Sequence, residues 1–297
     1  MSKAWFHQKE RSNAFWIFIV RGIALHLGRP AARLLLYPIA LYFLLFSIRA
    51  RQASANYLRR IFQRQPRWTE QLKHFHCFAA TILDRVFLLS GQQHRLNIQI
   101  HNAHTPLENT KPDQGCILLG SHLGSFEVLR TLAFKQKNLP VKILMYSDHN
   151  ATLTRMLNVL NPEISNTVIP LGKADTLLKA KEYLDQGYSI GILGDRIGES
   201  DKQVECDFLG SPAYFPAGPL RLAATLNVPV VLFYGLYNGG RRYDVHFELL
   251  SEAPNVAGDE RPAFIHSLTC RYAQRLAHYA RQRPYNWFNF YEYWGKE

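Results

Sequence analysis

The sequence predicts an α/β fold in which a mixed, mostly parallel sheet is flanked by helices. The main observation is that, from Leu96 onward, short apolar runs alternate with longer segments whose apolar residues have helical spacing. The second is that a basic and apolar segment of different composition precedes this alternation. We therefore divide the chain into an N-terminal helical, membrane-associated module at residues 1–67 and an α/β domain at residues 68–297.

Each expected element follows from a local pattern. Apolar residues at helical spacing predict a helix over residues 72–89, which ends at Ser90 and Gly91. Apolar runs bounded by turn residues predict strands at residues 96–100, 116–120, 141–146, 167–170, 189–194, 230–234 and 243–250. The helices between them are expected at residues 125–137, 151–160, 174–186, 217–226 and 261–281.

Positive charge is concentrated at the N-terminal end of the chain. The whole sequence has 35 Lys and Arg against 23 Asp and Glu, a net charge of +12. Residues 1–67 contain twelve of the basic residues and one acid, Glu10, so this segment carries +11 and the rest only +1. A surplus of positive charge favours an anionic partner. Because the surplus lies in residues 1–67, this partner is expected to bind the N-terminal segment.

The same segment is also the most apolar part of the chain. Fifteen uncharged residues separate Arg33 from Arg49, with Pro38 among them, and a second apolar run covers residues 14–20. A helix of that length spans roughly 22 Å, less than the ~30 Å hydrocarbon core. We expect an anchor in the cytoplasmic leaflet, or a marginal single span, on an anionic membrane surface. The alternative is a buried helical hairpin. No nucleic-acid partner is expected, because no nucleic-acid-binding motif accompanies the charge.

Neither a metal site nor a cofactor is expected. Cysteines stand at positions 77, 116, 206 and 270 without CxxC spacing, which is typical of reduced thiols in a cytosolic compartment. His74, His76 and Cys77 lie on one predicted helix with no second pair of ligands, so they are interpreted as core or surface side chains. No GxSxG, HExxH, GxGxxG or phosphate-binding loop occurs.

The candidate chemistry lies in the turn after the apolar strand at residues 116–120. His122 comes directly after this strand, and Glu127 is expected in the first turn of the next helix. If Gly124 lets the chain fold back, the carboxylate of Glu127 reaches the imidazole and orients it as a general base. The alternatives are a surface histidine beside a helix N-terminal acid, or Ser121 or Ser125 acting as a nucleophile.

Two further motifs follow this one in order. Gly194-Asp195-Arg196 ends an apolar strand, and residues 215–219 form a proline-containing block before a helix and a strand. Together with His122 and Glu127, these motifs resemble the bacterial lipid A biosynthesis (lauroyl/myristoyl) acyltransferase family, within the glycerol-phosphate and lysophospholipid acyltransferase superfamily. The resemblance extends over nearly the whole chain, and three motifs in the right order are more specific than any one.

The resemblance implies transfer of a fatty acyl group from acyl carrier protein or acyl-CoA to a lipid hydroxyl, through a ternary complex. It implies no cofactor, and a location at the cytoplasmic face of the cell inner membrane. His122 would take the proton of the hydroxyl, and Glu127 would orient and stabilise the imidazole. A non-catalytic lipid-binding membrane protein is the alternative of a different class.

Four more residues are candidates for substrate binding. Backbone amides near Gly124 and Ser125, or a cationic side chain, would bind the oxyanion. Arg196 would contact a phosphate of donor or acceptor, with Asp195 holding it, although a salt bridge within the turn is an alternative for this pair. Residues 204–214 are expected to border the acyl groove.

Two departures from the family pattern concern the acceptor. Ser125 and Phe126 stand where lipid A enzymes typically carry Asn and Trp, and the ending at residues 285–290 differs as well. The acyl-transfer chemistry is unaffected by these differences. The acceptor can therefore be a lipid A or glycolipid precursor, or another membrane lipid such as a lysophospholipid or a polyene lipid.

Overall fold

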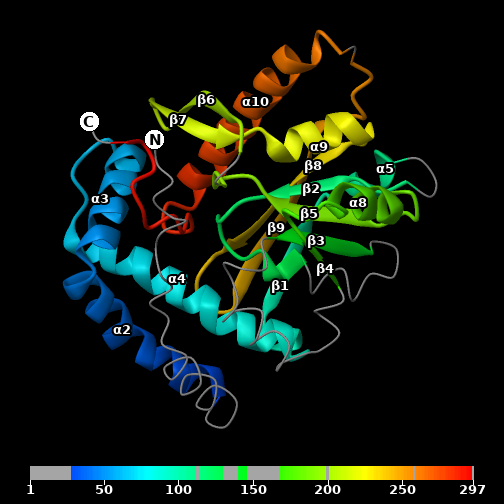
Figure 1. Ribbon diagram of the computed structural model, residues 1–297. Coiled ribbons are helices and arrows are strands. Elements are labelled where there is room, and N and C mark those ends of the chain that lie inside the picture. Colours follow the sequence, from blue (N-terminus) through cyan, green and yellow to red (C-terminus); the bar gives the residue numbers. More distant parts are fainter. Residues whose placement is uncertain are drawn as a thin grey trace.

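The computed structural model describes residues 28–110, 114–129, 140–145, 167–198, 201–256 and 258–295 (Figure 1). The apolar run at residues 14–20, the expected helix at 151–160 and most of the helix at 125–137 lie outside the described residues.

A seven-stranded sheet forms the centre of the described structure, in the order β1-β9-β8-β2-β5-β3-β4 (Figure 1). All its described pairs are parallel except β8 with β9. This confirms the predicted mixed, mostly parallel sheet. The strands are β1 (Asn97–His101), β2 (Ile117–Gly120), β3 (Val141–Met145), β4 (Val168–Pro170), β5 (Ser189–Leu193), β8 (Val230–Tyr237) and β9 (Arg242–Ser251).

Helices cover both faces of this sheet. Successive side chains of a strand point to opposite faces, so Leu119 of β2 packs with Tyr272 of one helical layer, and Leu118 packs with Phe87 of the other. The first layer contains α8 (Thr176–Leu184), α9 (Gly218–Leu226) and α10 (Arg261–Gln282), and α4 (Trp68–Leu89) lies in the second. Shorter helices are η1 (Gln93–Arg95) and α5 (Thr105–Glu108).

Two helices precede α4, namely α2 (Gly28–Phe46), which contains Pro38, and α3 (Ile48–Phe62). One side of α2 presents buried residues four positions apart, Ala32, Leu36, Ala40 and Leu44, and this side packs with residues of α4. In α3, Tyr57 and Leu58 belong to the same buried cluster as β2 and β5. The domain boundary at residue 67 stays a prediction, and the described helices on its N-terminal side share the core of the α/β domain.

A β-hairpin that the sequence analysis did not predict covers part of α10. Its strands are β6 (Gln203–Phe208) and β7 (Ser211–Pro216), which pair antiparallel. The two-residue turn is Leu209-Gly210, both at positive φ (57° and 80°). Such turns ordinarily carry Asn-Gly or Asp-Gly. Because Leu209 gives no such signal, the hairpin could not be found from the turn residues.

An ion pair between α2 and α4 lies inside the protein. The Nε and Nη2 atoms of Arg29 donate to the two carboxylate oxygens of Asp84 at 2.6 and 2.7 Å. Asp84 is fully buried and Arg29 is 4% exposed, and the hydroxyl of Tyr243 also donates to Asp84 at 2.9 Å. This pair fixes the start of α2 on the α/β domain.

Asp84→Asn is expected to lower the free energy of unfolding by about 3 kcal/mol, because it leaves the buried guanidinium of Arg29 without a counter-charge. Urea unfolding followed by circular dichroism measures the change. Asp185→Asn is the matched control, since its partner Lys181 lies 2.6 Å away but both side chains are 57% exposed. The control is expected to change stability by less than about 0.5 kcal/mol. Equal effects of the two substitutions would contradict the prediction.

Candidate active site

The candidate site lies where two neighbouring parallel strands end. β2 and β5 pair in register from Ile117 with Ile190 to Gly120 with Leu193. His122 follows β2 by two residues, and Asp195 follows β5 by two residues. Because the carboxyl ends of parallel strands meet at one edge of the sheet, these side chains come together there.

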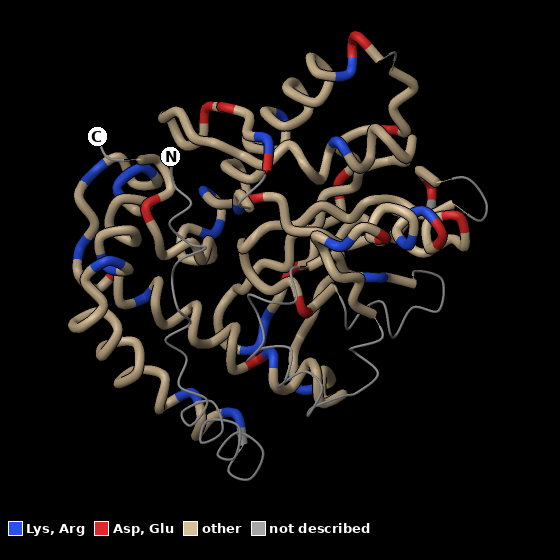
Figure 2. Tube along the Cα trace, in the orientation of Figure 1, with Lys and Arg blue, Asp and Glu red and all other residues tan. Residues whose placement is uncertain are grey.

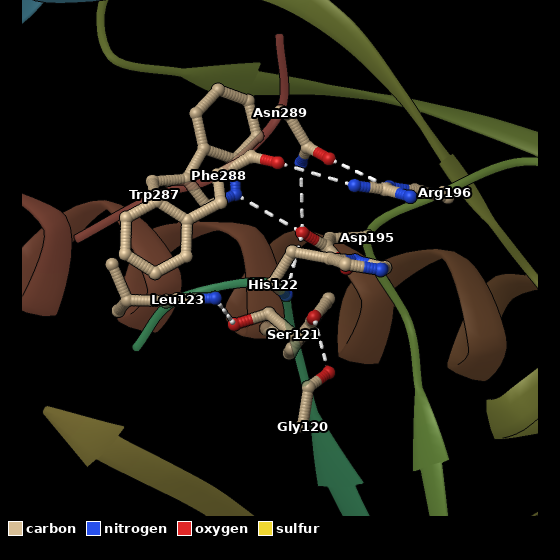
Figure 3. Close-up of polar contacts among 10 residues, drawn as sticks. Gly120, Ser121, His122, Leu123, Asp195, Arg196, Trp287, Phe288 and Asn289 are labelled. Atoms are coloured by element: carbon tan, nitrogen blue, oxygen red, sulfur yellow. Dashed lines mark hydrogen bonds and ion pairs between the residues drawn. The ribbon is translucent and has the colours of Figure 1, made fainter. Parts of the chain in front are cut away.

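The carboxylate of Asp195 accepts hydrogen bonds from three residues in two segments of the chain (Figure 3). Its Oδ1 lies 2.8 Å from Nδ1 of His122. Its Oδ2 accepts from the backbone amide of His122 at 2.9 Å, from Nε1 of Trp287 at 3.0 Å and from Nδ2 of Asn289 at 2.9 Å. A carboxylate surrounded by N–H donors is favoured in its ionised form.

The electrostatics of the pair leave the imidazole neutral at pH 7. Burial raises the pKa of Asp195, but His122 and Arg196 outweigh it and lower that pKa to about 2. Burial, followed by the charge of Arg196, lowers the pKa of His122 below 6.5 despite the opposing effect of Asp195. Because an ionised Asp195 can only accept, the ring proton lies on Nδ1 of His122. Nε2 is then an acceptor on a side chain that is 26% exposed.

The C-terminal segment holds the pair in place, which sequence reasoning missed. The carbonyl of Trp287 contacts Nε2 of His74 in α4 at 2.8 Å, and the amide of Phe288 donates to the carbonyl of His122 at 2.8 Å. Trp287 and Asn289 are both buried. The only signal in the sequence was that polar residues interrupt an aromatic run at 285–290, and spacing alone could not direct them to Asp195.

Arg196 is fixed beside the pair through Asn289. Nε of Arg196 donates to Oδ1 of Asn289 at 2.7 Å, and Nη2 donates to the carbonyl of Phe288 at 3.1 Å. The amide of Asn289 thus bridges the two charged residues, because its nitrogen donates to Asp195. From the sequence we expected Asp195 to hold Arg196. The structure instead places Asn289 between them and directs Asp195 to His122 (Figure 3).

Glu127 lies elsewhere than expected. Its side chain is buried, with Oε1 3.7 Å from Nε of Arg85 in α4. The carboxylate that contacts the imidazole of His122, at Nδ1, is that of Asp195. Glu127 begins a helical turn whose next residues, Val128 and Leu129, pack in the same buried cluster as α4. No local pattern in the sequence favours Asp195, because the pairing of β2 with β5 is a long-range contact.

The backbone amides proposed for the oxyanion already have acceptors. The amide of Gly124 donates to the carbonyl of Asn286 at 2.8 Å, and that of Ser125 donates to the carbonyl of Gly235 at 2.7 Å. Gly124 has φ of +77°, and a Cβ there would overlap the carbonyl of Gly235. Glycine is therefore required at position 124 for the close approach to β8. These two amides therefore hold the turn after β2 against the C-terminal segment and β8.

Comparison with known proteins agrees with the predicted family. Residues 3–296 match the family model for bacterial lipid A biosynthesis acyltransferases. Among solved structures, the chain is similar to the 1-acyl-sn-glycerophosphate (LPA) acyltransferase PlsC from Thermotoga maritima, with 15% identity and a TM-score of 0.38, over 82% of this chain and 95% of that chain. No curated protein matches the chain. Because the family model spans nearly the whole sequence, this chain belongs to the bacterial lipid A biosynthesis acyltransferase family and is an acyltransferase.

Proposed function

We propose that this acyltransferase works at the cytoplasmic face of the inner membrane and moves a fatty acyl chain from a thioester donor to the hydroxyl of a lipid A or glycolipid-type acceptor. One observation carries the proposal: a neutral His122, bonded through Nδ1 to an ionised Asp195, keeps Nε2 as an acceptor on a side chain that is partly exposed. That arrangement is suited to a general base.

In the proposed step, Nε2 of His122 takes the proton of the acceptor hydroxyl as its oxygen attacks the thioester carbonyl carbon. The tetrahedral intermediate then collapses, the carbon–sulfur bond breaks, and His122 returns the proton to the leaving thiolate. Asp195 keeps the proton on Nδ1 and stabilises the imidazolium. Ser121 and Ser125 are each only 4% exposed, which supports direct transfer over an acyl-serine intermediate.

Negative charge that develops on the substrate requires a donor in this site. Since the amides of Gly124 and Ser125 have acceptors within the protein, we assign this task to the guanidinium of Arg196. Its Nε and Nη2 bonds to the 288–289 segment fix its position, and its charge lowers the pKa of His122, so it lies within electrostatic reach of the base. A phosphate group of the donor or the acceptor would bind to the same guanidinium of Arg196.

Glu127 keeps a supporting role in this proposal. Its contact with Arg85 connects the helical turn after His122 to α4. Arg85 also lowers the pKa of His122, and it lies close enough to the site to do so. We propose that Glu127 positions Arg85 and the turn that carries His122, while Asp195 orients the imidazole.

Membrane association is supported by the outer side of α2. Residues 29–46 are long and apolar enough to cross a membrane, and 28% of them are buried. Opposite the buried residues, α2 exposes a row of large apolar side chains, Leu34, Tyr37, Leu41, Tyr42, Leu45 and Phe46. No Lys or Arg occurs in α2 beyond Arg33, as Figure 2 shows. We propose that this apolar row lies in the lipid.

Arginines surround a cavity of about 250 Å³ at the start of α2. Arg29, Arg95 and Arg241 line it together with Pro30, and Arg33 donates to the nearby carbonyl of Gly240. The carboxylate that pairs with an arginine of this cavity is that of Asp84, which binds Arg29. These arginines support the predicted anionic partner. We propose that this end of α2 contacts the anionic headgroups of the membrane surface.

The donor is proposed to be acyl carrier protein rather than acyl-CoA, on the basis of exposed arginines on α10. Four arginines near the C-terminus are candidates from the sequence for binding an acidic partner, namely Arg271, Arg275, Arg281 and Arg283. Arg275 pairs with Glu248 at 2.6 Å, and Arg283 lies 3.7 Å from Asp244, so these two act within the protein. Arg271 and Arg281 remain exposed. Docking of an acidic carrier is therefore proposed at these two arginines and the basic N-terminal segment.

His122→Ala and Asp195→Asn are each expected to lower acyl transfer by roughly 10² or more, since they remove the base and its orienting acceptor. Purified variants are assayed with a lipid acceptor and an acyl thioester, and circular dichroism verifies folding. His278→Ala and Asp185→Asn, both exposed, are the controls and should keep the wild-type rate. A folded His122→Ala protein with wild-type turnover would refute the mechanism. A larger loss in Glu127→Gln than in Asp195→Asn would assign the orienting role to Glu127.

The pH dependence of kcat/KM is expected to report His122. Activity requires the neutral imidazole, so kcat/KM should rise with pH through a pKa below 6.5 and then stay level. Arg196 lowers the pKa of His122, so Arg196→Gln should move the acid limb to higher pH, whereas Arg221→Gln on α9 should leave it in place. Movement of the limb to lower pH in Arg196→Gln would contradict the electrostatic argument.

Leu41→Ser combined with Leu45→Ser is expected to lower vesicle binding by at least roughly tenfold, because each exposed leucine contributes about 1.5–3 kcal/mol when buried in an apolar phase. Flotation with anionic vesicles measures the bound fraction. Leu178→Ser is the control, since Leu178 is 62% exposed on α8.

The electrostatic contribution is tested separately in the same flotation assay. Arg95→Gln combined with Arg241→Gln should weaken binding to anionic vesicles and spare binding to neutral ones. Identical losses on both vesicle types would exclude headgroup charge as the cause.

A further inference from the structure

Three metal-ligating side chains gather on strands β1 and β9, outside the candidate active site. They are His101, Asp244 and His246, and their ligand atoms all lie within 4.8 Å of one another. We propose that these residues bind one divalent transition-metal ion of the Zn²⁺ class, with water in the remaining coordination position. This inference does not depend on the proposed acyl-transfer mechanism.

The sheet register brings the three side chains together. His101 stands beside His246 in the parallel pairing of β1 with β9, and Asp244 precedes His246 by two residues on the same strand. Residues two apart on a strand share a face, and neighbouring strands are about 4.8 Å apart. The two imidazoles are accordingly parallel, with centroids 4.5 Å apart and planes 9° apart. Nε2 of His101 lies 4.0 Å from Oδ1 of Asp244.

Neighbouring groups orient the carboxylate toward the histidines. The amide nitrogen of Asn238 donates to Oδ2 of Asp244, and Nη2 of Arg283 lies 3.7 Å from the same oxygen. Oδ1 of Asp244 therefore faces His101. Hydrogen bonds to the outer oxygen of a ligating carboxylate are a usual feature of metal sites, because they fix the direction of the inner oxygen.

The guanidinium of Arg283, which contacts the outer oxygen of Asp244, also makes hydrogen bonds outside the proposed site. Nε of Arg283 donates to Oδ1 of Asn238, and Nη1 donates to the carbonyl of Gln282 at 3.1 Å. This guanidinium contacts Oδ2 of Asp244, whereas His101 lies nearest to Oδ1. The ring of Tyr279 packs against His246 with a centroid distance of 5.3 Å and limits the motion of that imidazole.

The donor set selects the class of metal. Two imidazole nitrogens and one carboxylate oxygen suit Zn²⁺ and its neighbours Co²⁺, Ni²⁺ and Cu²⁺, whereas Mg²⁺ and Ca²⁺ prefer oxygen ligands alone. The three ligands come from two strands, and β1 is an edge strand whose described partner in the sheet is β9. A bound ion would therefore link β1 to β9 at this edge of the sheet.

Isothermal titration of the metal-free, full-length protein with ZnCl₂ tests the site. We expect one Zn²⁺ per chain with a micromolar or lower Kd, and a Kd at least tenfold higher in His101→Ala, because one of three protein ligands is lost. His104→Ala is the matched control, since His104 is an exposed histidine three positions along the chain and contacts Glu108. This control also accounts for weak binding by other histidines.

Unchanged Zn²⁺ affinity in His101→Ala, or no binding in the wild type up to millimolar ZnCl₂, would overturn the proposal. A second readout is the thermal midpoint, which ZnCl₂ at about 100 times Kd should raise by roughly 5 °C in the wild type and in His104→Ala. The rise should be absent in His101→Ala and in Asp244→Asn. Because His101 is exposed at the edge of the sheet, its variant is expected to fold, and the metal-free midpoint verifies this.

Discussion

The described structure depends most on a single buried anion, the carboxylate of Asp195. Moving an ion from water into a protein costs several kcal/mol unless hydrogen bonds replace its hydration. Four N–H groups do so here, from the turn after β2 and from the C-terminal segment. Removal of any one would leave a buried charge underbonded, so the turn with His122 and the segment with Trp287 and Asn289 must both adopt the observed positions.

The helices at the N-terminal side are joined to this anion by direct packing. His74 of α4 contacts the hydroxyl of Ser54 in α3 through Nδ1 and the carbonyl of Trp287 through Nε2, at 2.9 and 2.8 Å. The indole of Trp287 packs against the rings of Tyr57 in α3 and Phe208 in β6, with centroids 5.0 and 5.1 Å apart. Because α2, which carries the exposed apolar row, packs on α3 and α4, it is joined through these helices to the segment that positions the base.

Close packing of the turn after β2 also limits which groups can stabilise negative charge on the substrate. The approach of Gly124 to Gly235 attaches the turn to β8, and it uses the amides of Gly124 and Ser125 as structural donors. In our proposal, positive charge for the substrate comes from the side chain of Arg196, which Asn289 holds beside His122. The proposed site thus uses a fixed cation where many acyl-transfer enzymes use backbone amides.

The sequence by itself determined the fold class, the family, the succession of the main strands along the chain and the place of His122 directly after one of them, because apolar periodicity and short motifs are local properties. It also located the basic, apolar N-terminal segment. Only the tertiary structure decided that Asp195 contacts His122, that Trp287 and Asn289 complete this contact, and that Glu127 faces Arg85. These contacts join residues 42 to 94 positions apart or depend on which face a turn presents. Strand pairing and core packing set such contacts, and no local pattern in the sequence specifies them.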